Sequence, residues 1–121
     1  MRELTAIPYL LVAIGGAVGS VLRYSASVLF GARPLTTFAV NISGAFLIGL
    51  LASTSIDAKT RLAVGTGVLG GFTTFSAWQL EAVSAARAEG VPIQAFAILF
   101  GSLVVGFAAC WIGYAVGQRL R

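Results

Sequence analysis

The spacing of its charges is the feature that most constrains this chain. It holds eight Lys and Arg and four Asp and Glu among 121 residues. These charges separate four long uncharged stretches, at residues 4–22, 34–56, 62–80 and 90–118. A helix needs roughly 20 predominantly apolar residues to cross the hydrocarbon core of a membrane. The spacing therefore predicts an all-α membrane protein with four transmembrane helices, and residues 1–121 as one four-helix unit with no soluble domain.

The composition excludes the common soluble classes. Hydrophobic residues make up 58% of the chain and charged residues 10%, whereas soluble domains average about 45–50% and about 25%. So short and apolar a chain cannot cover a compact surface with polar groups. The single cysteine, Cys110, excludes an intrachain disulfide scaffold, and with no histidine no nucleophile–base pair can be assembled, so we expect no enzyme.

Three other membrane or helical classes fit less well. A cleaved signal peptide ends in small residues, whereas Arg23 and Tyr24 follow the first stretch. A transmembrane β-barrel alternates apolar and polar residues, and a soluble helical bundle has a polar face on every helix. The run FLIGLL at 46–51 neither alternates in this way nor contains residues for a polar face.

The net charge of +4 does not predict nucleic-acid binding, because the basic residues lie singly at the ends of the stretches rather than in a patch. Their expected role is interfacial anchoring and topology. With a cytoplasmic N-terminus, five basic residues lie inside (Arg2, Lys59, Arg61, Arg119 and Arg121), and Arg33, Arg87 and, on one assignment, Arg23 lie outside. The bias is weak, so insertion in both orientations stays open.

Glycines are frequent, 15 in all, and several pairs are four residues apart. Such spacing lets helices approach closely in lipid. We expect dense packing and a contribution to a subunit interface. The pairs are Gly15 and Gly19, Gly67 and Gly71, and Gly113 and Gly117.

Polar groups at membrane depth mark candidate sites, because they are costly without partners. Asn41 lies in the second stretch, where it can donate to an anion or bond another helix. The run GGFTTFS at 70–76 is a poor helix centre. A break there frees backbone carbonyls, as at the ion sites of transporters, although hydroxyls of Thr73, Thr74 and Ser76 can instead repair a simple kink.

Four further residues complete the candidate set. Phe75 and Trp78 share a helix face, and the positive edges of aromatic rings favour an anion, although such pairs often serve only packing. Ser102 adds a hydroxyl at depth. Arg23 and Glu81 end the first and third stretches; both can reach the interface, and Glu81 can also line a vestibule.

These residues resemble the small bacterial fluoride channels of the CrcB or Fluc family. The matching segments are GGAVGSVLRY at 15–24, VNISGAFLIG at 40–49, GVLGGFTTFS at 67–76 and, more weakly, FGSL at 100–103. They span nearly the whole chain in order. The resemblance implies a multi-pass protein of the bacterial inner membrane that passively exports F⁻, built as an antiparallel dual-topology dimer with two pores and a third helix broken at mid-membrane.

The resemblance also implies residue roles. Backbone carbonyls of Gly70 and Thr73 would hold a structural Na⁺ at the dimer centre. The fluoride pore would include Asn41, Phe75 and Ser102, and Arg23 matches the arginine that ends the family's first helix. Beside them we place Trp78, Thr74 and Ser76 in the pore and Glu81 as a further functional residue.

Two departures from the family pattern bear on the pore. Trp78 stands where the family usually has a second phenylalanine, and Ile98 stands where some members have a polar residue. Both leave a heterodimer with a paralogous subunit open beside the homodimer. The alternative function is a small proton-coupled multidrug-type exporter, but such a protein needs an acid deep in a helix, whereas Glu3 precedes the first stretch and Glu81 follows the third.

Overall fold

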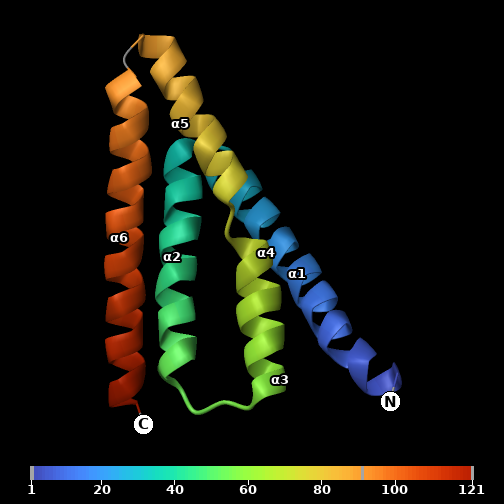
Figure 1. Cartoon of the computed structure of the whole chain (residues 1–121). Coiled ribbons are helices and arrows are strands. Elements are labelled where there is room, and N and C mark those ends of the chain that lie inside the picture. Colours follow the sequence, from blue (N-terminus) through green and yellow to red (C-terminus); the bar gives the residue numbers. More distant parts are fainter. Residues whose placement is uncertain (1, 91, 121) are drawn as a thin grey trace.

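The computed structural model describes residues 2–90 and 92–120, whose regular structure is entirely helical. Helix α1 (Arg2–Phe30) runs up from the N-terminus in the view of Figure 1, and α2 (Pro34–Ser53) returns. The next segment runs up again as α3 (Ala58–Arg61), the wider π-helical η1 (Leu62–Leu69), α4 (Gly70–Phe72) and α5 (Phe75–Glu89). Helix α6 (Pro92–Arg119) runs back, so both termini lie at the same end.

Three of these helices are long and apolar enough to cross a membrane. They contain the spans Ala6–Phe30, Pro34–Ser53 and Ala95–Arg119, with mean hydropathies of 1.6, 1.8 and 2.3. A 20-residue helix rises about 30 Å, which matches the hydrocarbon core. The sequence prediction of an all-helical membrane protein is confirmed at this level.

Charges are poor guides to where the helices end. The first predicted stretch stops at residue 22, but α1 continues through Arg23 to Phe30 and ends before Gly31, whose φ is +85°. The third stretch stops at residue 80, but α5 continues past Glu81 to Glu89, where Gly90 takes the left-handed conformation. Only turn residues end these helices, because a charged side chain can stay helical wherever it finds water or a polar partner.

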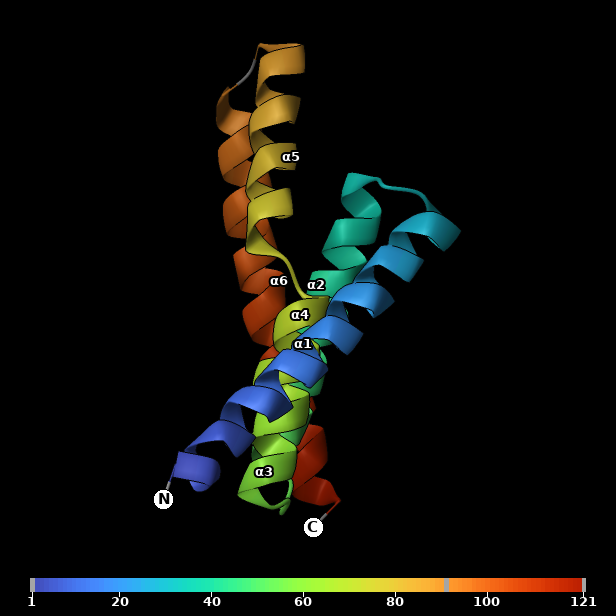
Figure 2. The ribbon, with the colours of Figure 1, turned by 90° about the vertical axis from the view of Figure 1, so that its right-hand side faces the viewer.

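Close approaches between glycines and backbone join α1 to η1 and join α2 to α6. A Cβ atom at Gly15 or Gly19 would overlap the backbone of η1, and Figure 2 shows α1 crossing that segment. A Cβ atom at Gly113 would overlap the Phe46 carbonyl of α2. Gly67, Gly71 and Gly117 likewise face backbone of this same chain. All three predicted glycine pairs thus serve packing within the chain, and their contribution to a subunit interface stays a prediction.

Two basic residues close helix ends rather than standing free. The Arg33 guanidinium donates to the Phe30 carbonyl at the end of α1. The Arg61 guanidinium donates to carbonyls at the end of α2, those of Leu51, Ala52 and Thr54. These bonds satisfy carbonyls that have no partner within their own helix.

The outer surface of the single chain is strongly apolar. Its buried hydrophobic side chains, within the part of the chain described, are Val40, Leu69, Trp78 and Ala82. None of the most apolar window of α6 is buried. Exposed apolar surface on this scale needs lipid or another protein to cover it. The fold is therefore that of a multi-pass membrane protein.

Candidate functional site

The helical path between η1 and α5 is interrupted at two threonines. Thr73 has φ −79° and ψ 157°, and Thr74 has φ −145° and ψ 122°, so both are extended. Gly70 remains helical, with φ −64° and ψ −37°. The sequence placed the weak point in the right run, but the extended residues follow the glycines rather than including them.

Hydroxyls and backbone compensate one another at this interruption. The Thr73 hydroxyl donates to the Leu69 carbonyl at 3.0 Å. The Thr74 hydroxyl accepts from the Ala77 backbone N–H at 3.4 Å and caps α5. Threonine is well suited to both tasks, because its short hydroxyl reaches nearby backbone groups.

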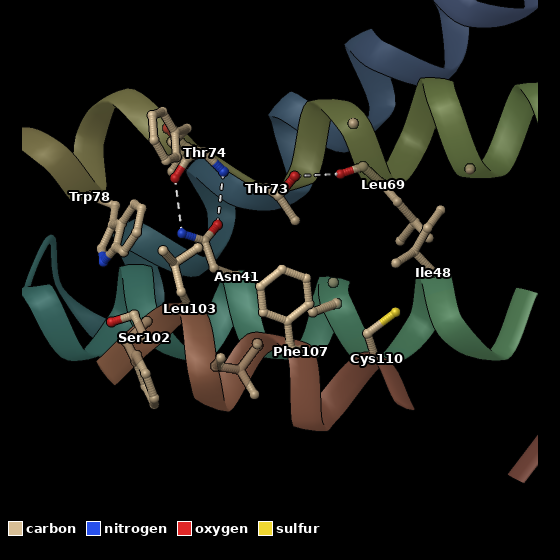
Figure 3. Close-up of a pocket in the computed structure, with 18 residues that line it drawn as sticks. Asn41, Ile48, Leu69, Thr73, Thr74, Trp78, Ser102, Leu103, Phe107 and Cys110 are labelled. Carbon is tan, nitrogen blue, oxygen red and sulfur yellow. Dashed lines mark hydrogen bonds between the residues drawn. The ribbon is translucent and has the colours of Figure 1, made fainter. Parts of the chain in front are cut away.

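Asn41 of α2 pairs with the backbone of Thr74 (Figure 3). Its Nδ2 donates to the Thr74 carbonyl at 2.9 Å, and its Oδ1 accepts from the Thr74 N–H at 2.8 Å. The side-chain amide of Asn41 thereby bonds the extended backbone of Thr74 as a neighbouring β-strand would. It keeps one N–H that these two bonds do not use.

This pairing changes the hydrogen bonding of two carbonyls. In a continuous α-helix the Gly70 carbonyl accepts from the N–H of Thr74, and the Thr73 carbonyl from that of Ala77. Here Thr74 donates to Asn41, and Ala77 donates to the Thr74 hydroxyl. The Gly70 and Thr73 carbonyls have therefore lost their usual donors and can accept from, or ligate, something else.

Arg23 and Glu81 each tie two helices together. Arg23 Nε donates to the Gly71 carbonyl at 3.3 Å, which ties α1 to α4. Glu81 Oε1 accepts from the Thr37 hydroxyl at 2.7 Å, which ties α5 to α2. Neither residue sits at a helix end, where the sequence had placed both, and neither is among the residues that line the cavity described next.

A partly open cavity of about 490 Å³ lies between α2, α6 and the interrupted segment (Figure 3). None of its lining residues is charged. Its lining includes the amide and hydroxyl side chains of Asn41, Thr73, Thr74 and Ser102, and the indole of Trp78. The end of the cavity farther from Ser102 is apolar and is lined by Ile48, Leu69, Phe107 and Cys110. The arrangement offers a small polar solute neutral donors and acceptors in an apolar setting.

The structure brings most of the predicted site residues to this cavity. Those that line it are Gly70, Thr73, Thr74, Asn41, Phe75, Trp78 and Ser102. Ser76 is exposed and does not line it. Sequence reasoning missed Phe38 and Phe107, which line the cavity, and Thr37, which bonds Glu81. Phe38 precedes Asn41 by three residues and so shares its helix face. Phe107 gave no signal, because an apolar residue in an apolar helix does not stand out.

Phe75 and Trp78 form an aromatic pair, with ring centroids 5.1 Å apart and planes at 57°. Their exposures differ widely. Phe75 is 63% exposed, whereas Trp78 is 7% exposed. Phe75 thus presents its ring to whatever covers this face of the chain, and Trp78 belongs to the wall.

The fold and the cavity define a multi-pass helical membrane protein with an uncharged internal site. A family model described as "CrcB-like protein, Camphor Resistance (CrcB)" matches residues 10–114. The chain belongs to this CrcB-like family.

Several curated proteins are similar over nearly their full lengths. A protein of Agrobacterium fabrum named fluoride-specific ion channel FluC is 48% identical, covering 91% of this chain and 95% of its own. A FluC of Acidobacterium capsulatum is 42% identical over 93% and 97%. A FluC 2 of Yersinia pseudotuberculosis is 42% identical over 92% and 100%. These names give no support to the multidrug-type exporter.

Proposed function

We propose that this chain is the subunit of a fluoride-specific channel that lets F⁻ leave the bacterial cell passively through the inner membrane. The similarity to proteins named as fluoride channels, at 48% and 42% identity over almost the whole chain, carries this proposal. A negative membrane potential drives an anion outward, with about 2.3 kcal/mol per charge for each 100 mV. Export therefore needs no chemical fuel.

The chemistry of the cavity supports an anion path. Fluoride is small and strongly hydrated, so a pore has to replace its water with hydrogen-bond donors. The free N–H of Asn41, the Ser102 hydroxyl and the ring edge of Phe75 are such groups. A fixed positive charge would hold the ion too tightly, and conduction requires that the ion can leave. No charged side chain lines the cavity.

A fourth crossing of the membrane is supported by the lengths of the helices. Helices α3, η1 and α4 together run over residues 58–72, and α5 has 15 residues. A 15-residue helix rises only about 22 Å, which is less than the roughly 30 Å of the hydrocarbon core. The two pieces together are long enough to cross the membrane once. This crossing, the third in chain order, is a helix broken at Thr73 and Thr74. Backbone of this kind is tolerated at membrane depth only when protein or a polar cavity satisfies it.

Sodium fits the carbonyls at the break. The Gly70 and Thr73 carbonyls lack their usual helical donors, and unwound carbonyls ligate Na⁺ in membrane proteins. Gly70 is exposed on the single chain, and two carbonyls alone make an incomplete shell. A second copy would supply two more. Na⁺ would then hold two breaks together without being transported.

An antiparallel homodimer meets these needs. Gly70, Phe75 and Ser76 are all exposed on one chain, so a partner would cover the open side of the cavity. The weak bias of basic residues between the two ends allows insertion in both orientations. Proteins named FluC 2 and FluC 3 occur in Yersinia, and a paralogous partner is the alternative that the test below distinguishes.

Flux from vesicles tests the proposal. Purified protein reconstituted alone, in vesicles loaded with potassium fluoride, should release F⁻ when a potassium ionophore is added. Vesicles loaded with potassium chloride should release no chloride. A silent protein that becomes active only with a paralogous chain would replace the homodimer with the heterodimer. Silence in both cases, with sodium present, would contradict the proposed function.

A further inference from the structure

Trp78 carries a donor that the fold leaves unused. Its side chain is 7% exposed, and its Nε1 is buried without a hydrogen-bond partner among the residues described. The indole N–H can only donate. Buried donors are almost always paired, and one that is not calls for an explanation such as an ion or a water at the site.

The cavity is where that partner can be found. Trp78 and Ser102 both line it. In Figure 3 the nitrogen of Trp78 lies on the side of the ring that faces the Ser102 hydroxyl of α6. Two neutral donors, an N–H and an O–H, thus belong to the same end of the cavity, and no charged side chain lines it.

We propose that the indole N–H of Trp78 donates a hydrogen bond to fluoride in this cavity, together with the Ser102 hydroxyl. This inference rests on the proposed function and adds a donor at a position where a phenylalanine would have none. Hydrogen bonds to charged groups are the strong ones, so an N–H at this point binds a bare anion better than a ring edge does.

The burial of the nitrogen makes the donor selective. Surrounding atoms close Nε1 off from bulk water, so an ion reaches it only after losing its water. A small ion needs the least movement. Chloride is larger, and packed walls resist expansion. Trp78 therefore favours fluoride over chloride as well as binding it.

Spectroscopy on the unaltered protein tests the donor directly. The chain has two tryptophans, and Trp111 on α6 is 75% exposed, which makes it an internal control. With ¹⁵N-labelled indoles, added fluoride should move the Trp78 N–H signal downfield in a saturable way and add a coupling to ¹⁹F. The Trp111 signal should stay, and equal chloride should move neither. Trp111→Phe assigns the two signals.

Flux through variants supplies the second measurement. Trp78→Phe keeps a ring and removes the donor, so we expect the half-saturating fluoride concentration to rise about tenfold, as for one hydrogen bond to an ion. Trp111→Phe should change nothing.

The outcomes separate the two proposals. A wild-type protein that carries fluoride with an unmoved Trp78 signal overturns the donor role and leaves the channel intact. A Trp78 signal that is already hydrogen-bonded without fluoride, and that shifts in Ser102→Ala, also overturns it, because the serine is then the partner. A wild-type protein that carries no fluoride overturns the proposed function instead.

Discussion

Asn41 has two tasks at the scale of a single residue. It holds the extended backbone of Thr74 through a donor and an acceptor, at 2.9 and 2.8 Å. It also keeps one N–H at the cavity wall. The first task is structural and the second is available to an ion, so the same amide joins the helix break to the proposed path.

Asn41→Asp separates these tasks from simple packing. The aspartate keeps the shape and the acceptor for Thr74 but loses the donor, and it brings a negative charge to an anion path. We expect fluoride efflux to fall at least about tenfold, the effect of losing one buried hydrogen bond. Ser43→Ala on the same helix is the control, because Ser43 is exposed and bonds the Val40 carbonyl of its own helix. Equal flux in both variants would exclude Asn41 from the path.

Phe75→Ile tests the ring edge. Isoleucine keeps much of the apolar bulk and removes the positive edge that can face an anion. Fluoride efflux should fall about tenfold, the cost of about one such contact with an ion. Phe96→Ile is the matched control, since Phe96 is exposed on α6 and does not line the cavity. If the fall is the same in both, the loss reflects apolar packing and not the pore.

At the scale of elements, glycine decides how closely the helices approach. A Cβ atom at Gly49 of α2 would overlap the Cys110 carbonyl of α6, whereas one at Gly101 would meet nothing within 4 Å. Both are glycines inside long helices, but only Gly49 faces the backbone of another helix. They therefore form a matched pair for measuring the α2–α6 contact.

Gly49→Ala should destabilise the fold by about 1–3 kcal/mol, the usual cost of overpacking. Gly101→Ala should be neutral or stabilising by up to about 1 kcal/mol, because alanine is the better helix former. Unfolding of the purified protein in detergent measures both. Equal stability of the two variants would show that α2 and α6 pack differently.

The turn between α2 and α3 adds a charge-dependent cap. Asp57 accepts from the Thr60 hydroxyl and from the backbone N–H groups of Thr60 and Lys59. The bond from the Thr60 side chain, followed by those from the backbone, lowers the pKa of this carboxyl below its ordinary 3.8. The ionised form is thus the stabilising one.

The pH dependence follows from that direction. The contribution of Asp57 is complete above pH 3.8 and is lost as the pH falls through the lower value in the folded protein. At neutral pH the wild type should therefore melt above Asp57→Asn, whose cap does not ionise. The difference in melting temperature between the two proteins should shrink in strong acid. A difference in melting temperature that is constant with pH would mean that the carboxylate charge does not contribute to stability.

At the scale of the whole molecule, a single chain leaves its site open. Phe75 is 63% exposed, and apolar side chains cover most of the outside. The two freed carbonyls of Gly70 and Thr73 come from one chain only. A partner and a sodium ion would close the cavity and complete the ligands.

Removal of sodium tests that assembly. Replacing Na⁺ with a large organic cation on both sides should lower fluoride efflux and lower the melting temperature, because a ligand bound only by the folded dimer stabilises it by mass action. The protein in detergent should also have twice the mass of one 12.5 kDa chain. A monomer indifferent to sodium would contradict the assembly.

The sequence by itself determined the class of the protein and most of the candidate residues. Long uncharged stretches leave a chain no environment but the membrane, and polar residues at depth stand out because lipid cannot satisfy them. Four such polar residues, Asn41, Thr73, Thr74 and Ser102, line one cavity together with Gly70, Phe75 and Trp78, whose roles the family resemblance implies or the aromatic pattern suggests.

Only the tertiary structure decided which polar group bonds which. Arg23 stays inside α1 because the Gly71 carbonyl lies near, and Glu81 stays inside α5 with Thr37 as its partner. These partners are 48 and 44 residues away along the chain, and no local pattern encodes such a distance. The unpaired Trp78 N–H is of the same kind, because whether a buried donor is satisfied depends on what the other helices bring to it.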